Sequence, residues 1–157
     1  MTVYTTLNKI RACDPCKGGW ETLLSSLGKT NPDNEPLSLI SILESNGLDD
    51  ALWCTRTVFD QHRDKIVQYA IRCAENVLHI FENAVQDKQA PRLATQAAKD
   101  YLEGKNTKAN LDAAVAAAAA ATRAADAAAW AADAATRAAE KKFQRTLFRE
   151  IFGEVQP

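Results

Sequence analysis

An alanine-rich segment at residues 111–140 constrains the fold of this chain more than any other feature. Nineteen of its thirty residues are alanine, which has the highest intrinsic helix propensity, so the segment is predicted to be helical. A seven-residue pattern repeats within it as ATRAADA at 121–127, AAWAADA at 128–134 and ATRAAEK at 135–141. The large and charged side chains of these repeats are three or four positions apart and therefore share one helix face: Arg123, Asp126, Trp130, Asp133, Arg137 and Glu140.

The length of this helix conflicts with a compact domain. A helix that continued from 107 to 151 would be about 67 Å long at about 1.5 Å per residue. A compact domain of 157 residues has a diameter of roughly 40 Å. The helix therefore either breaks or extends to a partner. Its heptad periodicity favours association with a second copy of the chain, and a hairpin against residues 66–81 is the alternative.

The rest of the chain also predicts helices, because apolar residues recur at spacings of three and four and the alternation typical of strands is absent. Start and stop signals place helices at about 5–12, 19–27, 36–46, 49–59, 60–80 and 91–104. We therefore predict an all-α fold, a bundle of about six or seven helices with a long alanine-rich C-terminal helix. Residues 1–157 form a single helical domain in this prediction, with an N-terminal bundle at 1–104 and the heptad-repeat helix and an amphipathic tail at 105–157.

The charge balance argues against a nucleic-acid partner. The chain has 19 Lys+Arg and 20 Asp+Glu, a formal net charge of −1, without the basic excess typical of nucleic-acid-binding proteins. The first residues lack the features of a signal peptide, and the one long weakly polar stretch contains charges, so no membrane span is predicted. We expect a cytoplasmic protein in which the four cysteines remain thiols.

No motif of the chain completes a catalytic or metal site. Cys13 and Cys16 have the C-x-x-C spacing of thiol oxidoreductases and of half a zinc site, but the strand expected before a redox motif and the remaining zinc ligands are missing. The Gly28-Lys29-Thr30 sequence lacks the first glycine of a phosphate-binding loop and follows a predicted helix. We therefore expect no enzyme, no cofactor and no metal, and interpret the cysteines mainly as buried or incidental thiols.

Acidic residues are concentrated between Asp14 and Asp50. This stretch contains seven acids against Lys17 and Lys29, a local balance of −5. The acids are Asp14, Glu21, Asp33, Glu35, Glu44, Asp49 and Asp50. Such a concentration predicts an acidic face that steers a basic protein partner and repels nucleic acid. The alternative is that these acids increase solubility and stabilise the starts of helices.

The charged face of the alanine-rich helix is a second candidate site. Two arginines on either side of an indole can bind an anion and stack on a ring, which is what a small nucleotide-like ligand requires. The candidate ligand-binding residues are Arg123, Asp126, Trp130, Asp133 and Arg137. The alternative is structural, because Asp133 and Arg137 have the spacing of an ion pair within one helix and Trp130 can contact a neighbouring helix or a second subunit.

Several stretches of the chain together resemble a known family. They are GWETLLSSLGKT at 19–30, DNEPLS at 33–38, ESNGLDDALWCTR at 44–56, IVQYAIRCAENVLHIFE at 66–82 and LFREIFG at 147–153. The sequence resembles the predicted immunity proteins of bacterial polymorphic-toxin systems, a family also found in phage genomes, whose members are helical with alanine-rich C-terminal repeats. GLDDALWC is the most specific of these stretches, since alanine repeats alone match by chance.

The resemblance implies a non-enzymatic protein that neutralises a toxin or a host defence protein by binding it. The positions that we take as its functional or architectural signature, and hence as candidate partner-binding residues, are Trp20, Lys29, Asp49, Asp50, Trp53, Arg56 and Arg72. Structural roles are the alternative for some of them, since Asp49 is a suitable helix cap and Trp53 a suitable core residue. A different function, sequestration of a small anionic signal between subunits of a homo-oligomer, would use the ligand-binding set on the alanine-rich helix instead.

Overall fold

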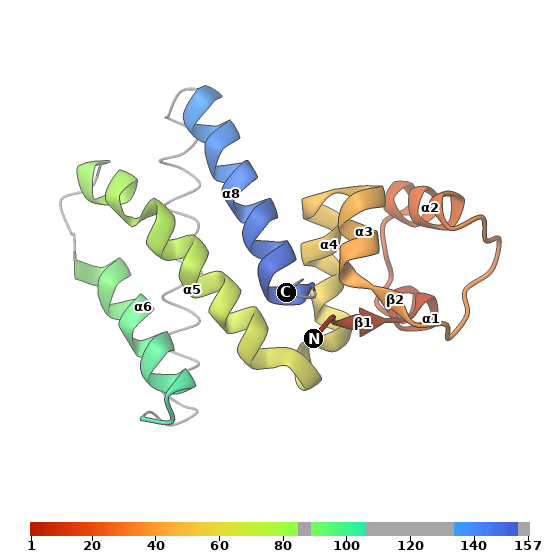
Figure 1. Cartoon of the computed structure of the whole chain (residues 1–157), viewed down its shortest axis with the longest axis horizontal. Coiled ribbons are helices and arrows are strands. Elements are labelled where there is room, and N and C mark those ends of the chain that lie inside the picture. The colour runs from red at the N-terminus through yellow and green to blue at the C-terminus, as the bar shows by residue number, and fades with distance from the viewer. Residues whose placement is uncertain (85–88, 106–133, 154–157) are drawn as a thin grey trace. The chain divides into compact units, whose positions relative to one another are not determined.

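The computed structural model describes residues 1–84, 89–105 and 134–153 (Figure 1). The described elements are helices except for one pair of two-residue strands, which confirms the all-α prediction. The chain divides into two compact units. The terminal unit contains Met1–Ile66 and the described residues 148–153, and the middle unit contains the described residues of Val67–Leu147. The predicted division at residue 104 stays a prediction.

The terminal unit holds most of the short elements. In chain order they are β1 (Tyr4–Thr5), α1 (Leu7–Ala12), α2 (Lys17–Ser26), β2 (Leu37–Ser38), α3 (Leu39–Asn46), α4 (Leu48–Cys54) and a 3-10 helix (Thr55–Val58). The start of α5 (Phe59–Ala84) and the end of α8 (Ala134–Phe152) complete it. The predicted first helix is confirmed, and Thr6 is its cap, because its Oγ1 accepts a hydrogen bond from the backbone N–H of Lys9.

The predicted helix start at residue 36 is wrong by three positions. Leu37 and Ser38 form β2, which pairs antiparallel with β1 in the register Tyr4↔Ser38 and Thr5↔Leu37. The helix begins at Leu39 because Ser38 caps it: Ser38 Oγ accepts a hydrogen bond of 2.9 Å from the backbone N–H of Ser41. Two-residue strands are too short to show the alternation of apolar and polar residues by which a sequence indicates a strand.

Two other helix boundaries follow backbone geometry. The predicted stop after Asn46 is confirmed, since Gly47 ends α3 with a φ of 90°. Gly47 is also the N-cap of α4, so the prediction that Asp49 caps this helix is wrong. Asp49 instead lies in the first turn, where an acidic side chain is favourable. Further on, α4 gives way to the 3-10 helix rather than continuing to residue 59, and α5 has non-helical backbone angles at His62.

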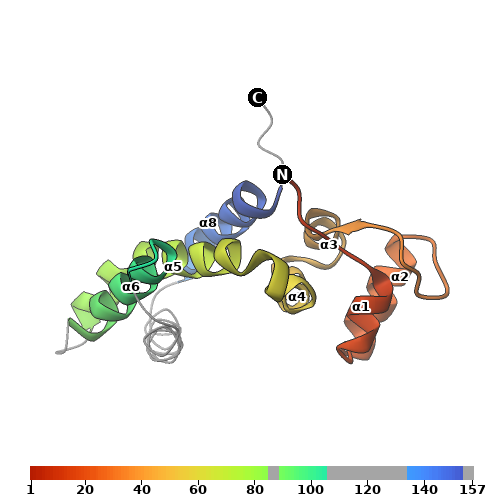
Figure 2. The ribbon, with the colours of Figure 1, turned by 90° about the horizontal axis from the view of Figure 1, so that it is seen from below.

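The core of the terminal unit joins the two ends of the chain. Phe148 and Phe152 are completely buried, with ring centroids 4.5 Å apart. The backbone N–H of Val3 donates to the carbonyl of Phe152, and the N–H of Leu39 donates to the carbonyl of Val3, both at 3.0 Å. Figure 2 shows the start of the chain close to the end of α8. The apolar side of the C-terminal tail is therefore part of the core.

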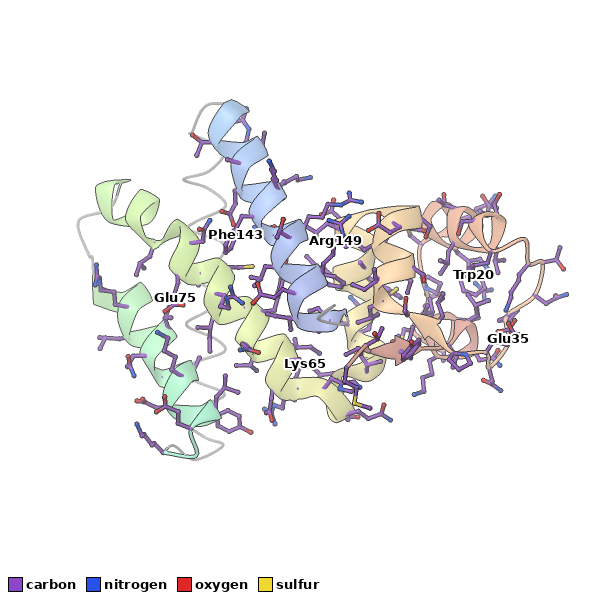
Figure 3. All side chains as sticks on the ribbon, in the orientation of Figure 1. Trp20, Glu35, Lys65, Glu75, Phe143 and Arg149 are labelled. Atoms are coloured by element: carbon purple, nitrogen blue, oxygen red, sulfur yellow. The ribbon has the colours of Figure 1, made fainter. Side chains whose placement is uncertain are left out.

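Charged side chains reinforce this arrangement of the termini. Lys65 Nζ donates hydrogen bonds of 2.9 Å to the carbonyls of Met1 and Ile151. Arg149 extends from α8 toward α3 (Figure 3), where its Nη2 lies 2.7 Å from Glu44 Oε1. Salt bridges of this exposure contribute little to stability, about 0–1 kcal/mol. The packing of the two phenylalanines is thus the larger effect.

The middle unit contains most of α5, α6 (Gln89–Leu102) and the first part of α8. Helices α5 and α6 lie side by side in both views (Figures 1 and 2), and Lys99 Nζ lies 2.5 Å from Glu75 Oε1. Glu140 of α8 accepts hydrogen bonds from Asn76 of α5 at 2.5 Å and from Gln144 at 2.8 Å. The predicted helix end at Gly104 is close to the observed one, and Gly104 has a φ of 71°.

Most of the alanine-rich segment falls at residues 106–133, outside the described residues. Whether the helix from 107 to 151 is continuous, and whether it pairs with a second copy or forms a hairpin, stay predictions. Among the helices of residues 1–84, 89–105 and 134–153, none is long and apolar enough to cross a membrane. The expected cytoplasmic location stays a prediction.

Candidate functional site

A small pocket in the terminal unit brings together side chains from α1, α2, α3 and α4. Its volume is about 100 Å³. Apolar lining comes from Ile10, Leu23 and Ile42, polar lining comes from Asn46 and Asp50, and the indoles of Trp20 and Trp53 form part of the wall. Three of the candidate partner-binding residues, Trp20, Asp50 and Trp53, therefore share one pocket, although α2 and α4 are separated by more than twenty residues in the chain.

Helix α2 positions Trp20 at one wall of the pocket. The helix begins after Cys16, whose Sγ accepts a hydrogen bond of 3.4 Å from the backbone N–H of Gly19. Trp20 points from α2 toward the interior of the terminal unit (Figure 3), and the guanidinium carbon of Arg11 lies 5.6 Å from the ring centroid. The indole is half-buried. Its contacts with α1 therefore fix the position of a large side chain that remains partly accessible.

Helix α4 supplies the second indole. The guanidinium carbon of Arg56 lies 4.1 Å from the centroid of the Trp53 ring, and Arg56 Nε donates a hydrogen bond of 3.0 Å to the Trp53 carbonyl. Cation–π contacts at exposed sites contribute about 0.5–1 kcal/mol. Arg56, another candidate partner-binding residue, is exposed and is not part of the pocket lining. Its observed role is to hold the Trp53 ring.

Asp50 is the charged group of the pocket. Its Oδ2 accepts a hydrogen bond of 2.9 Å from Asn46 Nδ2, which also donates to the Gly19 carbonyl at 2.7 Å. Asn46 thus connects α2, α3 and α4 in one network. The sequence predicts neither Asn46 nor Gly19 as a site residue, because Asn46-Gly47 is a typical helix stop signal. The one signal in the sequence was that Asn46 is a polar side chain at the end of a helix, where it can bind the backbone of a neighbouring helix.

Cysteine thiols border the pocket. Cys16 is exposed and Cys54 is buried, and both belong to the pocket lining. Burial raises the pKa of the Cys54 thiol to about 12, and the charge of Asp50 acts in the same direction. Cys54 is therefore a neutral thiol near pH 7 and a poor nucleophile. Cys13 and Cys16 are free thiols, and within the described residues no group of three His, Cys, Asp or Glu side chains could hold a metal ion.

Lys29 lies in the loop after α2 rather than in the pocket. Its Nζ is 2.5 Å from Asp33 Oδ2 and 2.6 Å from Glu35 Oε2. The hydrogen bonds to Asp33 and Glu35 raise the pKa of Lys29, and the hydrogen bond from Lys29 lowers the pKa of Asp33. The observed contacts of Lys29 therefore stabilise its own loop.

The acidic stretch is partly neutralised by such pairs. Besides Asp33 and Glu35, Glu44 pairs with Arg149, and Glu21 lies 3.9 Å from Lys17. At least four of the seven acids thus have a basic partner within the described residues, which lowers the charge density expected of an acidic face. Asp49 is exposed and adjoins the pocket residue Asp50 in α4.

The remaining candidate residues lie elsewhere. Arg72 is half-buried in the part of α5 that belongs to the middle unit. Of the ligand-binding set, Arg137 is exposed on α8. The other four, Arg123, Asp126, Trp130 and Asp133, lie outside the described residues. A nucleotide site on the alanine-rich helix therefore stays a prediction.

The fold and the pocket define an all-α protein whose candidate site is suited to noncovalent binding. Residues 56–142, more than half of the chain, match the model of the Imm-5 like putative immunity protein family, so the chain belongs to this family. No curated protein and no solved structure matches the chain. The family match includes Arg56, Arg72 and the ligand-binding set, whereas the pocket residues precede it in the sequence.

Proposed function

We propose that the chain is a non-enzymatic immunity protein that neutralises a protein toxin by binding to it. Membership of the Imm-5 like family carries this proposal. The family description names a protective role and no chemistry, and a protein that protects without catalysis must occupy or cover its target. The target is expected to be a bacterial toxin domain, in keeping with the resemblance to immunity proteins of polymorphic-toxin systems.

The pocket of the terminal unit supports a binding role. Tryptophan and arginine are enriched among residues that dominate the energy of protein interfaces, and such residues act in or beside preformed pockets. Trp20 and Trp53 line a preformed pocket, and Arg11 and Arg56 hold their rings. A binding surface with its aromatic side chains already ordered loses less conformational entropy on association.

A growth-rescue experiment tests the proposal. Toxin domains encoded next to genes of this family are expressed in bacterial cells with and without the chain, and purified pairs are then analysed by native mass spectrometry. We expect one toxin to be neutralised and to form a stoichiometric complex with the chain. Trp53→Ala should weaken that complex by about 2 kcal/mol or more, the size typical of an interface hot spot.

A charge variant distinguishes electrostatic steering of the toxin, which affects the association rate, from the contacts that hold the complex together. Asp49→Lys changes an exposed charge beside the pocket, so it should slow association and reduce its salt dependence while dissociation changes little. The exposed Phe59→Ala variant serves as a control for the tryptophan substitution. If the chain rescues growth from none of the toxins and forms no complex with them, the proposed function is wrong.

A further inference from the structure

We infer that the pocket between Trp20 and Trp53 receives a lysine side chain of the protein partner, with its ammonium group at Asp50. The inference rests on the proposed function and adds the chemistry by which the partner is recognised. Three features carry it: the charge of the pocket, the nature and size of its walls, and the way in which Asp50 is held.

Asp50 determines the charge of the pocket. No other acidic, basic or histidine side chain belongs to the lining. In the part of the chain that the structure describes, no ion pair joins Asp50 to a basic side chain. The thiol of Cys54 adds no charge near pH 7. A cation in the pocket would therefore gain a favourable interaction with the carboxylate, and an anion would be repelled.

The walls suit an aliphatic stem that ends in a cation. Ile10, Leu23 and Ile42 provide apolar surface, and the indoles of Trp20 and Trp53 are the aromatic rings that attract cations most strongly. The volume of about 100 Å³ is smaller than the roughly 150 Å³ cavity that binds benzene. An unbranched methylene chain with a compact ammonium group fits this space better than a planar guanidinium, and lysine is the side chain of that shape.

The carboxylate of Asp50 is held in place before a partner binds. Asn46 donates to its Oδ2, and the same Oδ2 would lie 2.7 Å from a Cβ on Gly19. A carboxylate offers about four acceptor positions, and among the described contacts Asn46 uses one of them. Acceptor positions therefore remain for the three donors of an ammonium group, and little reorganisation is required.

Arg11 and Arg56 do not occupy the site. Their guanidinium groups lie over the rings of Trp20 and Trp53, and neither arginine belongs to the pocket lining. Both are exposed, so water and salt screen their repulsion of a cation in the pocket. The carboxylate, in contrast, forms part of the pocket wall itself.

Small probes test the inference on the whole chain without a known partner. The protein labelled with ¹⁵N is titrated with n-butylammonium, n-butanol and butyrate, and chemical shifts of the Gly19 amide and the Trp53 indole N–H are followed. We expect saturable shifts with n-butylammonium, binding about tenfold or more weaker for n-butanol, and no saturable shift with butyrate. Asp50→Asn should weaken n-butylammonium binding about tenfold, whereas Asp60→Asn, at an exposed carboxylate outside the pocket lining, should leave it unchanged.

Other outcomes would overturn the inference. Equal binding of n-butanol and n-butylammonium would identify a neutral apolar pocket, and stronger binding of butyrate would assign the site to an anion. Unchanged n-butylammonium binding in Asp50→Asn would remove the carboxylate from the site. Neutralisation of a toxin without n-butylammonium binding would leave the proposed function standing and contradict the inference. Binding of n-butylammonium without neutralisation of any toxin would contradict the proposed function. It would still show that the pocket binds an alkylammonium group.

Discussion

Gly19 and Asp50 lie so close together that no larger residue fits at position 19 without movement. A Cβ at Gly19 would stand 2.7 Å from Asp50 Oδ2 and 3.2 Å from Cys16 Sγ. The adjacent Gly18, in the same turn of α2, has no such neighbour within 4 Å. Helix α2 therefore approaches the Asp50 carboxylate at Gly19, where an added side chain would collide with it.

Alanine substitutions at these two glycines should have opposite effects on stability. Gly18→Ala should increase the free energy of unfolding by about 0.5–1 kcal/mol through helix propensity, because the added Cβ has no neighbour within 4 Å. Gly19→Ala has the same gain but displaces the Asp50 carboxylate, and overpacking of this kind costs about 1–3 kcal/mol. Urea unfolding followed by tryptophan fluorescence measures both variants. Equal stabilisation by the two alanines would show that Asp50 moves away without cost.

The stability of the terminal unit should fall at alkaline pH through Cys54. The pKa of this thiol is 9.0 in its ordinary state and about 12 in the folded chain. The unfolded chain therefore loses the proton first, so the stabilisation is complete below pH 9 and is lost as the pH rises toward 12. The free energy of unfolding should decrease by up to about 1.4 kcal/mol per pH unit in this range.

The matched variants for this prediction are Cys54→Ala and Cys16→Ala. The first should reduce the slope of unfolding free energy against pH between pH 9 and 11, and the second should not, because Cys16 is exposed. Cys73, with its pKa raised by burial to about 11, adds a similar dependence in the middle unit and is unchanged in both variants. Identical slopes in all three proteins would contradict the assignment to Cys54.

The buried end of α8 should be essential to the stability of the terminal unit. Phe152 is completely buried against Phe148, so Phe152→Ala is expected to cost about 3–5 kcal/mol. Phe59 is 41% exposed and contacts Arg63, so Phe59→Ala should cost no more than about 1 kcal/mol. Urea midpoints compare the two. Similar midpoints would show that the C-terminal helix end contributes little to the core.

The sequence predicted the helices better than the details that build the pocket. The fold class and the ends of helices at Asn46 and Gly104 followed from periodicity and from glycine, which are local signals. The start of α3 and the cap of α4 depended on hydrogen bonds of Ser38 and on the backbone of Gly47, for which the sequence offered competing candidates in Pro36 and Asp49.

The pocket itself could be predicted only in part. Trp20, Asp50 and Trp53 were candidates because of a family resemblance, and tertiary packing brought them together. Asn46 and Gly19 were not candidates, because their roles are defined by the distance between two helices rather than by any spacing along the chain. Lys29 was a candidate on the same grounds as the tryptophans. It lies outside the pocket, because Asp33 and Glu35 of its own loop form ion pairs with it.

Two glycines with positive φ should differ in their tolerance of asparagine. Gly28 has a φ of 63°, in the left-handed region that asparagine also adopts, so Gly28→Asn should cost little. Gly47 has a φ of 90° and a ψ of −178°, a conformation essentially restricted to glycine, so Gly47→Asn should cost about 1–3 kcal/mol. Neither position has a neighbour within 4 Å of a Cβ, so the difference isolates backbone strain from crowding. Thermal and urea unfolding of the two variants measure it, and equal losses would indicate that the α3–α4 junction relaxes to a conformation open to other residues.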